Sequence, residues 1–191
     1  MSIADRLLDH YENKKFCKVM RQVAPGKLEK SDGYIVGYND EFVLMREVYD
    51  FVLDGYHVFP RNTIAEVRFD KFNRYYDRIL RKEGINTDIS NEHAIDLTSW
   101  ATIFRSIKKK GLPVIVENED PEDESFDIGP ITKVTQAAVY VRYFNAAGYL
   151  NETPTRILWK FITIAQFDDR YSKIFSKHLR ERKPKPQNEG S

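Results

Sequence analysis

The sequence has little cysteine, since Cys17 is the only one among 191 residues. A single cysteine excludes an intramolecular disulfide and a metal site built from a cysteine cluster. Because Cys17 stands in a largely apolar run, we expect it to be a small buried hydrophobe.

Long apolar runs are also missing, since none reaches the roughly 18 residues that a membrane-spanning helix needs. The N-terminal stretch MSIADRLLDHYENKK lacks the basic and then apolar order of a signal peptide. It has the pattern of a helix start instead. We therefore expect a cytoplasmic protein that does not enter a membrane.

Neither sign of charge is in excess, because 30 basic residues face 29 acidic ones and the formal net charge is +1. A dedicated nucleic-acid-binding protein usually has a clear basic excess, so only a local patch could serve that purpose here. Hydrophobic residues make up 41% of the chain, which is typical of a globular protein and too high for a disordered one.

Residue patterns that carry catalysis are absent from the sequence. The histidines His10, His57, His93 and His178 stand apart and form no His-Glu-x-x-His pattern. There is no glycine-rich phosphate loop and no nucleophile elbow. We therefore expect no catalytic residue, no metal and no cofactor. His10 and His178 are expected on helices, facing solvent or partly packed, and His57 on the exposed face of a strand.

What the sequence does contain is an internal repeat at a spacing of 96 residues. The matched pairs are Leu7 and Ile103, Tyr11 and Ile107, Lys14 and Lys110, Val19 and Ile115, Gly33 and Gly129, Ile35 and Ile131, Val43 and Val139, and Met45 and Val141. After a small insertion the spacing becomes 98, at Ile64 and Ile162 and at Phe69-Asp70 and Phe167-Asp168. We predict two units, residues 1–85 and 97–181, joined by a polar linker, 86–96, and followed by a disordered tail, 182–191.

Each unit has the pattern of a helix, five short strands and a closing helix. The leading helices show apolar residues at helical spacing, and Thr98 or Ser99 can cap the second one. Asn39-Asp40 is a turn dipeptide between two apolar runs and predicts a hairpin. The third strand of each unit, 42–45 and 139–144, is apolar or aromatic at nearly every position. We expect both of its faces to be covered, one by the core and the other by a helix, the sister unit or another chain.

This succession resembles the Sm-like small β-barrel family. The resemblance rests on DGYIVGYNDEFVLM (32–45) and GYHVFPRNTIAEV (55–67), and with the leading helix it spans most of residues 3–69. A weaker echo spans 98–168, and small barrels of the SH3 type share the same strand succession. The resemblance implies a mainly β fold with flanking helices: two tandem five-stranded small barrels, each preceded by a helix and followed by a short helix.

The RNA site of that family is less well matched than its fold. Sm-like proteins that hold RNA place an Asp and an Asn in a longer loop after the second strand and an Arg-Gly pair in the last loop. Here the turn is only Asn39-Asp40, and the last loops hold Arg61-Asn62 and Lys160-Phe161.

Candidate nucleic-acid-binding residues can nevertheless be named. They are Lys14, Lys15, Lys18, Tyr38, Asn39 and Arg61. Bases could stack on tyrosine beside a phosphate track of lysines. The alternative is that lysines at helix ends satisfy the helix dipole and tyrosines cover the core.

Two further features invite interpretation. The acidic run ENEDPEDESFD, 117–127, has no calcium-site spacing and is expected to be a solvated loop between strands, or a patch for a basic partner. A Phe-Asp followed by Arg-Tyr occurs in both units, with Asp70, Arg74 and Tyr75 in the first and Asp168, Arg170 and Tyr171 in the second. We interpret it as an Asp–Arg pair that ties the fifth strand to the last helix, with the tyrosine packed beneath.

These observations favour a non-catalytic interaction or scaffold protein that binds protein partners or itself. The alternative is a protein that binds RNA or single-stranded nucleic acid. An enzyme is the third hypothesis, which a deep pocket with convergent Asp, Arg and His would favour.

Overall fold

The computed structural model describes residues 2–87 and 89–182 of the chain. The first half contains α1 (Ile3–Glu12), β1 (Phe16–Ala24), β2 (Lys27–Tyr38), β3 (Phe42–Tyr49), β4 (Val52–Pro60), η1 (Arg61–Thr63), β5 (Ile64–Arg68) and α2 (Lys71–Lys82). The second half contains α3 (Trp100–Lys109), β6 (Pro113–Asn118), β7 (Ser125–Val134), β8 (Ala138–Val141), β9 (Thr155–Leu158), η2 (Trp159–Phe161), β10 (Ile164–Phe167), α4 (Arg170–Phe175) and η3 (Ser176–His178). Each half therefore has the predicted succession of elements.

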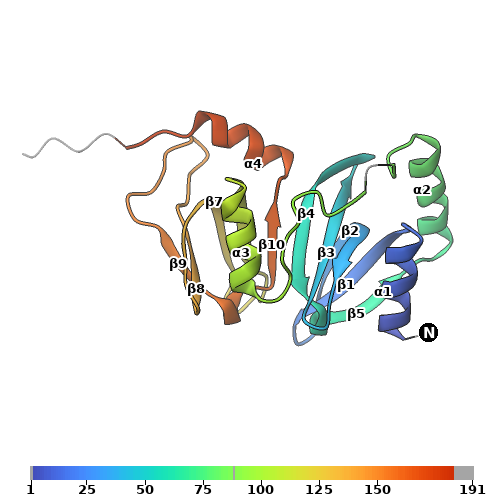
Figure 1. The fold of residues 1–191 in the computed structure, drawn as a ribbon. Coiled ribbons are helices and arrows are strands. Elements are labelled where there is room, and N and C mark those ends of the chain that lie inside the picture. Colours follow the sequence, from blue (N-terminus) through green and yellow to red (C-terminus); the bar gives the residue numbers. More distant parts are fainter. Residues whose placement is uncertain (1, 88, 183–191) are drawn as a thin grey trace, which may run out of the picture.

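The strands form one antiparallel ten-stranded sheet in the order β5-β1-β2-β3-β4-β10-β6-β7-β8-β9. The prediction of two separate five-stranded barrels is not what the structure contains, because β10 pairs with β4 and joins the halves into a single open sheet (Figure 1). The coarser expectation, a mainly β fold with flanking helices, agrees with the structure. We call residues 2–87 the first unit, 97–182 the second unit, and the β4–β10 pairing the junction.

The two units repeat each other strand by strand, with one correction to the predicted alignment. Cys17 pairs with Gly33 in the first unit and Val114 with Gly129 in the second, so β1 and β6 are offset by 114 − 17 = 97 residues. Val19 therefore corresponds to Val116 and not to Ile115. A shift of one residue in a strand reverses the face of the side chain, and Ile115 indeed lies in a different apolar cluster from Val116.

Each unit has a core under its leading helix. The first consists of Leu7 from α1 and residues of β1 to β5: Cys17, Val19, Ile35, Val43, Met45, Phe59, Ile64 and Val67. Their counterparts in the second unit belong to a larger cluster with α3: Val114, Val116, Ile131, Val139, Val141, Ile157, Ile162 and Ala165. Burial raises the pKa of the Cys17 thiol, and this residue is the buried hydrophobe that the sequence predicts.

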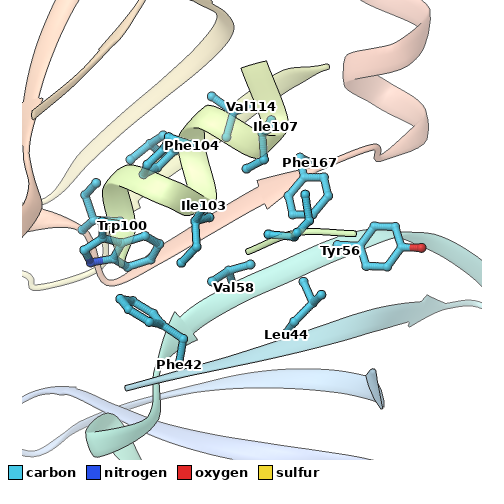
Figure 2. Close-up of a cluster of buried hydrophobic side chains, with 14 of the residues drawn as sticks. Phe42, Leu44, Tyr56, Val58, Trp100, Ile103, Phe104, Ile107, Val114 and Phe167 are labelled. Carbon is cyan, nitrogen blue, oxygen red and sulfur yellow. The ribbon is translucent and has the colours of Figure 1, made fainter. Parts of the chain in front are cut away.

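The larger cluster crosses the junction. Phe42, Leu44 and Val58 lie on the opposite face of β3 and β4 from the first core, and they pack in the same cluster as Trp100 and Ile103 of α3. Figure 2 shows the apolar side of α3 directed at these strands. Both faces of β3 are thus covered, one by its own core and the other by the second unit, as expected.

The linker is part of this packing. Ile89 and Ile95 are only 4% and 5% exposed, and the side-chain amide of Asn39 donates to the backbone oxygen of Leu97 at 2.8 Å. Where the structure describes the predicted linker, 86–96, these two isoleucines belong to the cluster that crosses the junction. The tail predicted to be disordered, 182–191, lies outside the described residues from 183 onward. Among the described helices, none has the length and apolar character needed to cross a membrane.

Candidate interaction site

The junction is the place where one unit accepts a strand of the other. In its register Val58 of β4 pairs with Ala165 of β10, His57 with Gln166, and Tyr56 with Phe167. On one face of the sheet the rings of Tyr56 and Phe167 stack with centroids 5.1 Å apart. On the other face His57 and Gln166 enter a network of polar side chains.

A buried ion pair anchors the polar face of the junction. Arg21 of β1 is 1% exposed and donates two hydrogen bonds to Glu119, from Nη1 to Oε2 at 2.6 Å and from Nη2 to Oε1 at 2.8 Å. The Thr163 hydroxyl donates to the same carboxylate at 2.7 Å. Burial opposes the ionisation of Glu119, but these donors and the charge of Arg21 outweigh it and lower its pKa. A cation of the first unit thus holds an anion of the second.

A second carboxylate lies beside this pair. The side-chain amide of Gln166 donates to Glu117. Burial, together with the neighbouring charge of Glu119, raises the pKa of Glu117. The incoming unit therefore carries two carboxyl groups into the junction, and only one of them has a buried cation as its direct partner.

His57 does not lie on the surface, contrary to the prediction. It is 7% exposed, with Nε2 at 2.8 Å from Oε2 of Glu47 and Nδ1 at 3.4 Å from Oγ of Ser31. Strand alternation correctly places it opposite Tyr56, but it lies on the face of the first core, beside Met45 and Phe59, and not on an exposed face. His10, expected to face solvent or to be partly packed, is buried at 3% exposed and lies edge-on to Phe69 at 5.0 Å.

Ser31, His57 and Glu47 contact one another in the sequence in which the nucleophile, base and acid of a catalytic triad do. Ser31 is only 2% exposed, so a substrate cannot reach its hydroxyl. In the second unit Asp127 stands in place of Ser31 and Thr155 in place of His57, so the pattern is not repeated. We interpret the three residues as part of the packing of the junction.

The stacked face carries a charged cluster that fastens the linker. The Tyr56 hydroxyl donates to the backbone oxygen of Ser90 and to Glu92, both at 3.0 Å, and Arg46 lies over the Tyr56 ring at 4.4 Å. Asp168 lies 3.2 Å from Nε2 of His93 and 3.5 Å from Nη1 of Arg46. Because these charged groups pair with one another, we interpret the cluster as an internal contact that holds the linker in place and not as an open binding site.

An open cavity of about 740 Å³ lies in the second unit beside β9. Six of its lining residues correspond, by strand register and by the turn that follows, to residues of the first unit, and two of these, Arg21 and His57, lie at the junction. The correspondences are Asn118 to Arg21, Asp127 to Ser31, Thr155 to His57, Ile157 to Phe59, Leu158 to Pro60, and Phe161 to Thr63. The cavity is therefore the second unit's counterpart of the place where β10 docks on the first unit.

The backbone edge of β9 borders this cavity. Within the described residues β9 pairs with β8 alone, at the end of the sheet. The Trp159 amide donates to the Ala137 oxygen at 3.3 Å, so by antiparallel alternation the amides of Arg156 and Leu158 point away from β8. In the first unit the Arg61 amide donates the equivalent bond to the Glu41 oxygen at 2.8 Å. The equivalent of Arg156 there is Val58, and Val58 pairs with β10. We call the cavity and this edge the β9 groove.

The β9 groove is acidic. Glu122, Asp123 and Glu124 of the β6–β7 loop line it together with Asp127, and Arg156 is the one cation among its lining residues. Burial raises the pKa of Asp127. Of the acidic run singled out in the sequence, residues 121–124 are exposed as expected, whereas Glu117 and Glu119 are the carboxylates of the junction.

The candidate nucleic-acid residues fall into separate groups. Tyr38, Asn39 and Arg61 meet at one turn, where Arg61 pairs with Asp40 at 3.0 Å and lies over the Tyr38 ring at 5.9 Å. Lys15 and Lys18 pair with Asp9 and Asp32, at 2.7 and 3.4 Å. Lys14 follows α1 with a positive φ of 43°, and its carbonyl accepts from Arg81.

The repeated Asp–Arg motif has a different basis from the one predicted. Asp70 is the N-cap of α2, but the cap of α4 is Asp169, so Arg74 and Arg170 stand at different positions of their helices. Neither arginine forms an ion pair among the described residues, and Asp168 faces Arg46, His93 and Lys173 instead. Tyr75 and Tyr171 are 62% and 52% exposed, so the expected packing beneath is wrong. Gly33 and Gly129, in contrast, occupy one position, where a Cβ atom would collide with the carbonyl oxygens of Arg46 and Arg142.

Comparison of the chain with models of protein families, with curated proteins and with solved structures gives no match. The resemblance to Sm-like barrels therefore stays a prediction.

Proposed function

We propose that this chain is a non-catalytic interaction protein that holds a strand of a protein partner, or of a second copy of itself, in the β9 groove. One observation carries the proposal: the β4 edge accepts β10 within the molecule, whereas the outer edge of its counterpart β9 has no strand partner among the described residues. An exposed strand edge is a template for strand addition, because its amides and carbonyls lack partners.

The cavity beside the edge supports this reading. At the junction Arg21 bonds to Glu119 and His57 pairs with Gln166 of the incoming unit, and their counterparts Asn118 and Thr155 line the cavity. A groove with both a main-chain edge and side-chain contacts offers affinity and specificity in the same place.

Blocking the edge without disturbing the fold tests the proposal. Proline tolerates a strand edge whose amide faces outward, so Arg156→Pro removes one edge donor, whereas Arg156→Ala keeps the donor and is the matched control. We expect partner proteins captured by the wild type, and any oligomer seen in sedimentation velocity, to be retained by Arg156→Ala and lost with Arg156→Pro. If both variants capture the same proteins and sediment as the wild type does, the proposal is wrong.

Nucleic-acid binding is the second candidate, and the meeting of Tyr38, Asn39 and Arg61 at one turn favours it. Against it, Arg61 already pairs with Asp40, and the Asn39 side chain accepts from the amides of Glu41 and Phe42. Binding that depends on this turn should weaken about fivefold or more in Arg61→Ala and fall steeply with salt. A protein that does not shift short oligonucleotides at low salt would exclude this candidate.

A further inference from the structure

The junction provides an internal model for an occupant of the β9 groove. There the host contributes the buried cation Arg21, and the docked unit brings Glu117 and Glu119. In the β9 groove the signs are reversed on the host side, because Asn118 replaces Arg21, Asp127 replaces Ser31, and three acidic residues of the β6–β7 loop join the lining. The occupant must therefore differ in charge from β10.

We propose that the β9 groove binds an extended segment of a partner protein that carries lysine or arginine, added as a strand antiparallel to β9. This inference rests on the proposed function and adds the chemistry of the partner. The strand edge and its occupied counterpart establish the place, and the acidic lining establishes the sign of the charge.

The register at the junction also predicts the order of side chains in the segment. Gln166 of β10 pairs with His57, and the counterpart of His57 is Thr155, which lies beside Asp127 in the groove. If the register is continued, Ile164, two residues before Gln166, lies opposite Phe59. The counterpart of Phe59 is Ile157, which lines the groove. Alternate residues of a strand point to the same face. The segment should therefore read apolar, any residue, basic.

A second copy of this chain fits the groove less well. By the same register its β5 would place Arg68 opposite Thr155, but also Glu66 opposite Ile157, next to the acidic loop. Arg68 already pairs with this Glu66 at 2.9 Å. A partner segment with an apolar residue at that position avoids the repulsion, and we therefore favour it over self-association.

Fluorescence anisotropy with the full chain and two labelled octapeptides tests the proposal. One peptide is Thr-Val-Ile-Thr-Lys-Val-Lys-Thr, and the other has glutamate at both lysine positions. We expect the basic peptide to bind at least about tenfold more tightly than the acidic one, with a difference that shrinks as salt is added. Hydrogen–deuterium exchange should show slower exchange at residues 155–158 when the basic peptide is bound.

Three variants separate the edge from the charge. Arg156→Pro should weaken the basic peptide about fivefold through the lost main-chain bond, whereas Arg156→Ala should strengthen it about twofold by removing a like charge. Glu122→Lys/Glu124→Lys should weaken it at least about tenfold. The control with the same change in net charge is Glu12→Lys/Glu83→Lys, at exposed positions at the ends of α1 and α2, and it should bind as the wild type does.

The outcomes distinguish this inference from the proposed function. Equal binding of both peptides, or equal loss in the two double-lysine variants, overturns the basic partner. If no peptide binds but sedimentation velocity gives oligomers that Arg156→Pro abolishes, the occupant is a second copy, and only this inference fails. If neither peptide binding nor association depends on Arg156→Pro, the proposed function fails as well.

Discussion

At the scale of single residues, the polar face of the junction contains a buried cation, Arg21. Glu119→Gln leaves the Arg21 guanidinium, 1% exposed, without its anion. Because an uncompensated buried charge is costly, we expect the free energy of unfolding to fall by about 3 kcal/mol. Denaturant titration measures it.

The double variant Arg21→Met/Glu119→Leu is the control for this prediction. It removes both charges and should lose less stability than Glu119→Gln alone, since an apolar pair of similar volume avoids the desolvation of the ions. A double variant that is less stable than either single one would mean that the ion pair itself supplies net stability.

A second residue-scale prediction concerns pH. Burial raises the pKa of Glu117 above that of the unfolded chain, so its contribution to stability is present at low pH and is lost as the pH rises through the folded-state pKa. Glu117→Gln cannot ionise and still accepts the hydrogen bond from Gln166. The gain in stability of this variant over the wild type should therefore grow as the pH rises from about 4.5 towards neutral. A difference that stays constant in pH-dependent denaturant titrations would contradict this.

At the scale of elements, the repeat makes a matched prediction for two glycines. Gly33 and Gly129 bring β2 and β7 against the carbonyl oxygens of β3 and of the segment after β8, and a Cβ atom at either position meets backbone that cannot move aside. Gly33→Ala and Gly129→Ala should each cost about 3 kcal/mol of unfolding free energy. Gly37→Ala is the control, because its Cβ would meet only side chains, at 3.4 Å and beyond, and it should cost less than about 1 kcal/mol.

The elements themselves could be predicted from the sequence because their signals are local. Ser99 caps α3, Asn39 closes the β2–β3 hairpin, and the apolar spacing marks each helix. The junction could not be predicted, because it pairs His57 with a residue more than 100 positions away. Alternation gave the correct face of His57 relative to Tyr56, but not that this face is the one turned to the first core.

Of the β9 groove, the sequence predicts the acidic residues but not the strand edge. The acidic run was recognisable as a possible patch for a basic partner, since charge is read directly from composition. That it lies beside a free strand edge follows only from the order of strands in the sheet. Arg74 and Arg170 do not occupy equivalent positions, contrary to the predicted repeat, because α2 and α4 begin at different distances from the shared Phe-Asp.

At the scale of the whole molecule, the shared cluster makes the two units one folding unit. Leu44 belongs to the first unit but packs in the cluster that contains Trp100 of α3, and both tryptophans, Trp100 and Trp159, lie in the second unit. Leu44→Ala should lower the free energy of unfolding by about 3 kcal/mol. It should shift the unfolding transition followed by tryptophan fluorescence as much as the one followed by far-ultraviolet circular dichroism, which reports both units. If the dichroism transition moves while the fluorescence transition stays in place, the units fold independently, and the junction is then a contact between two domains and not part of a common core.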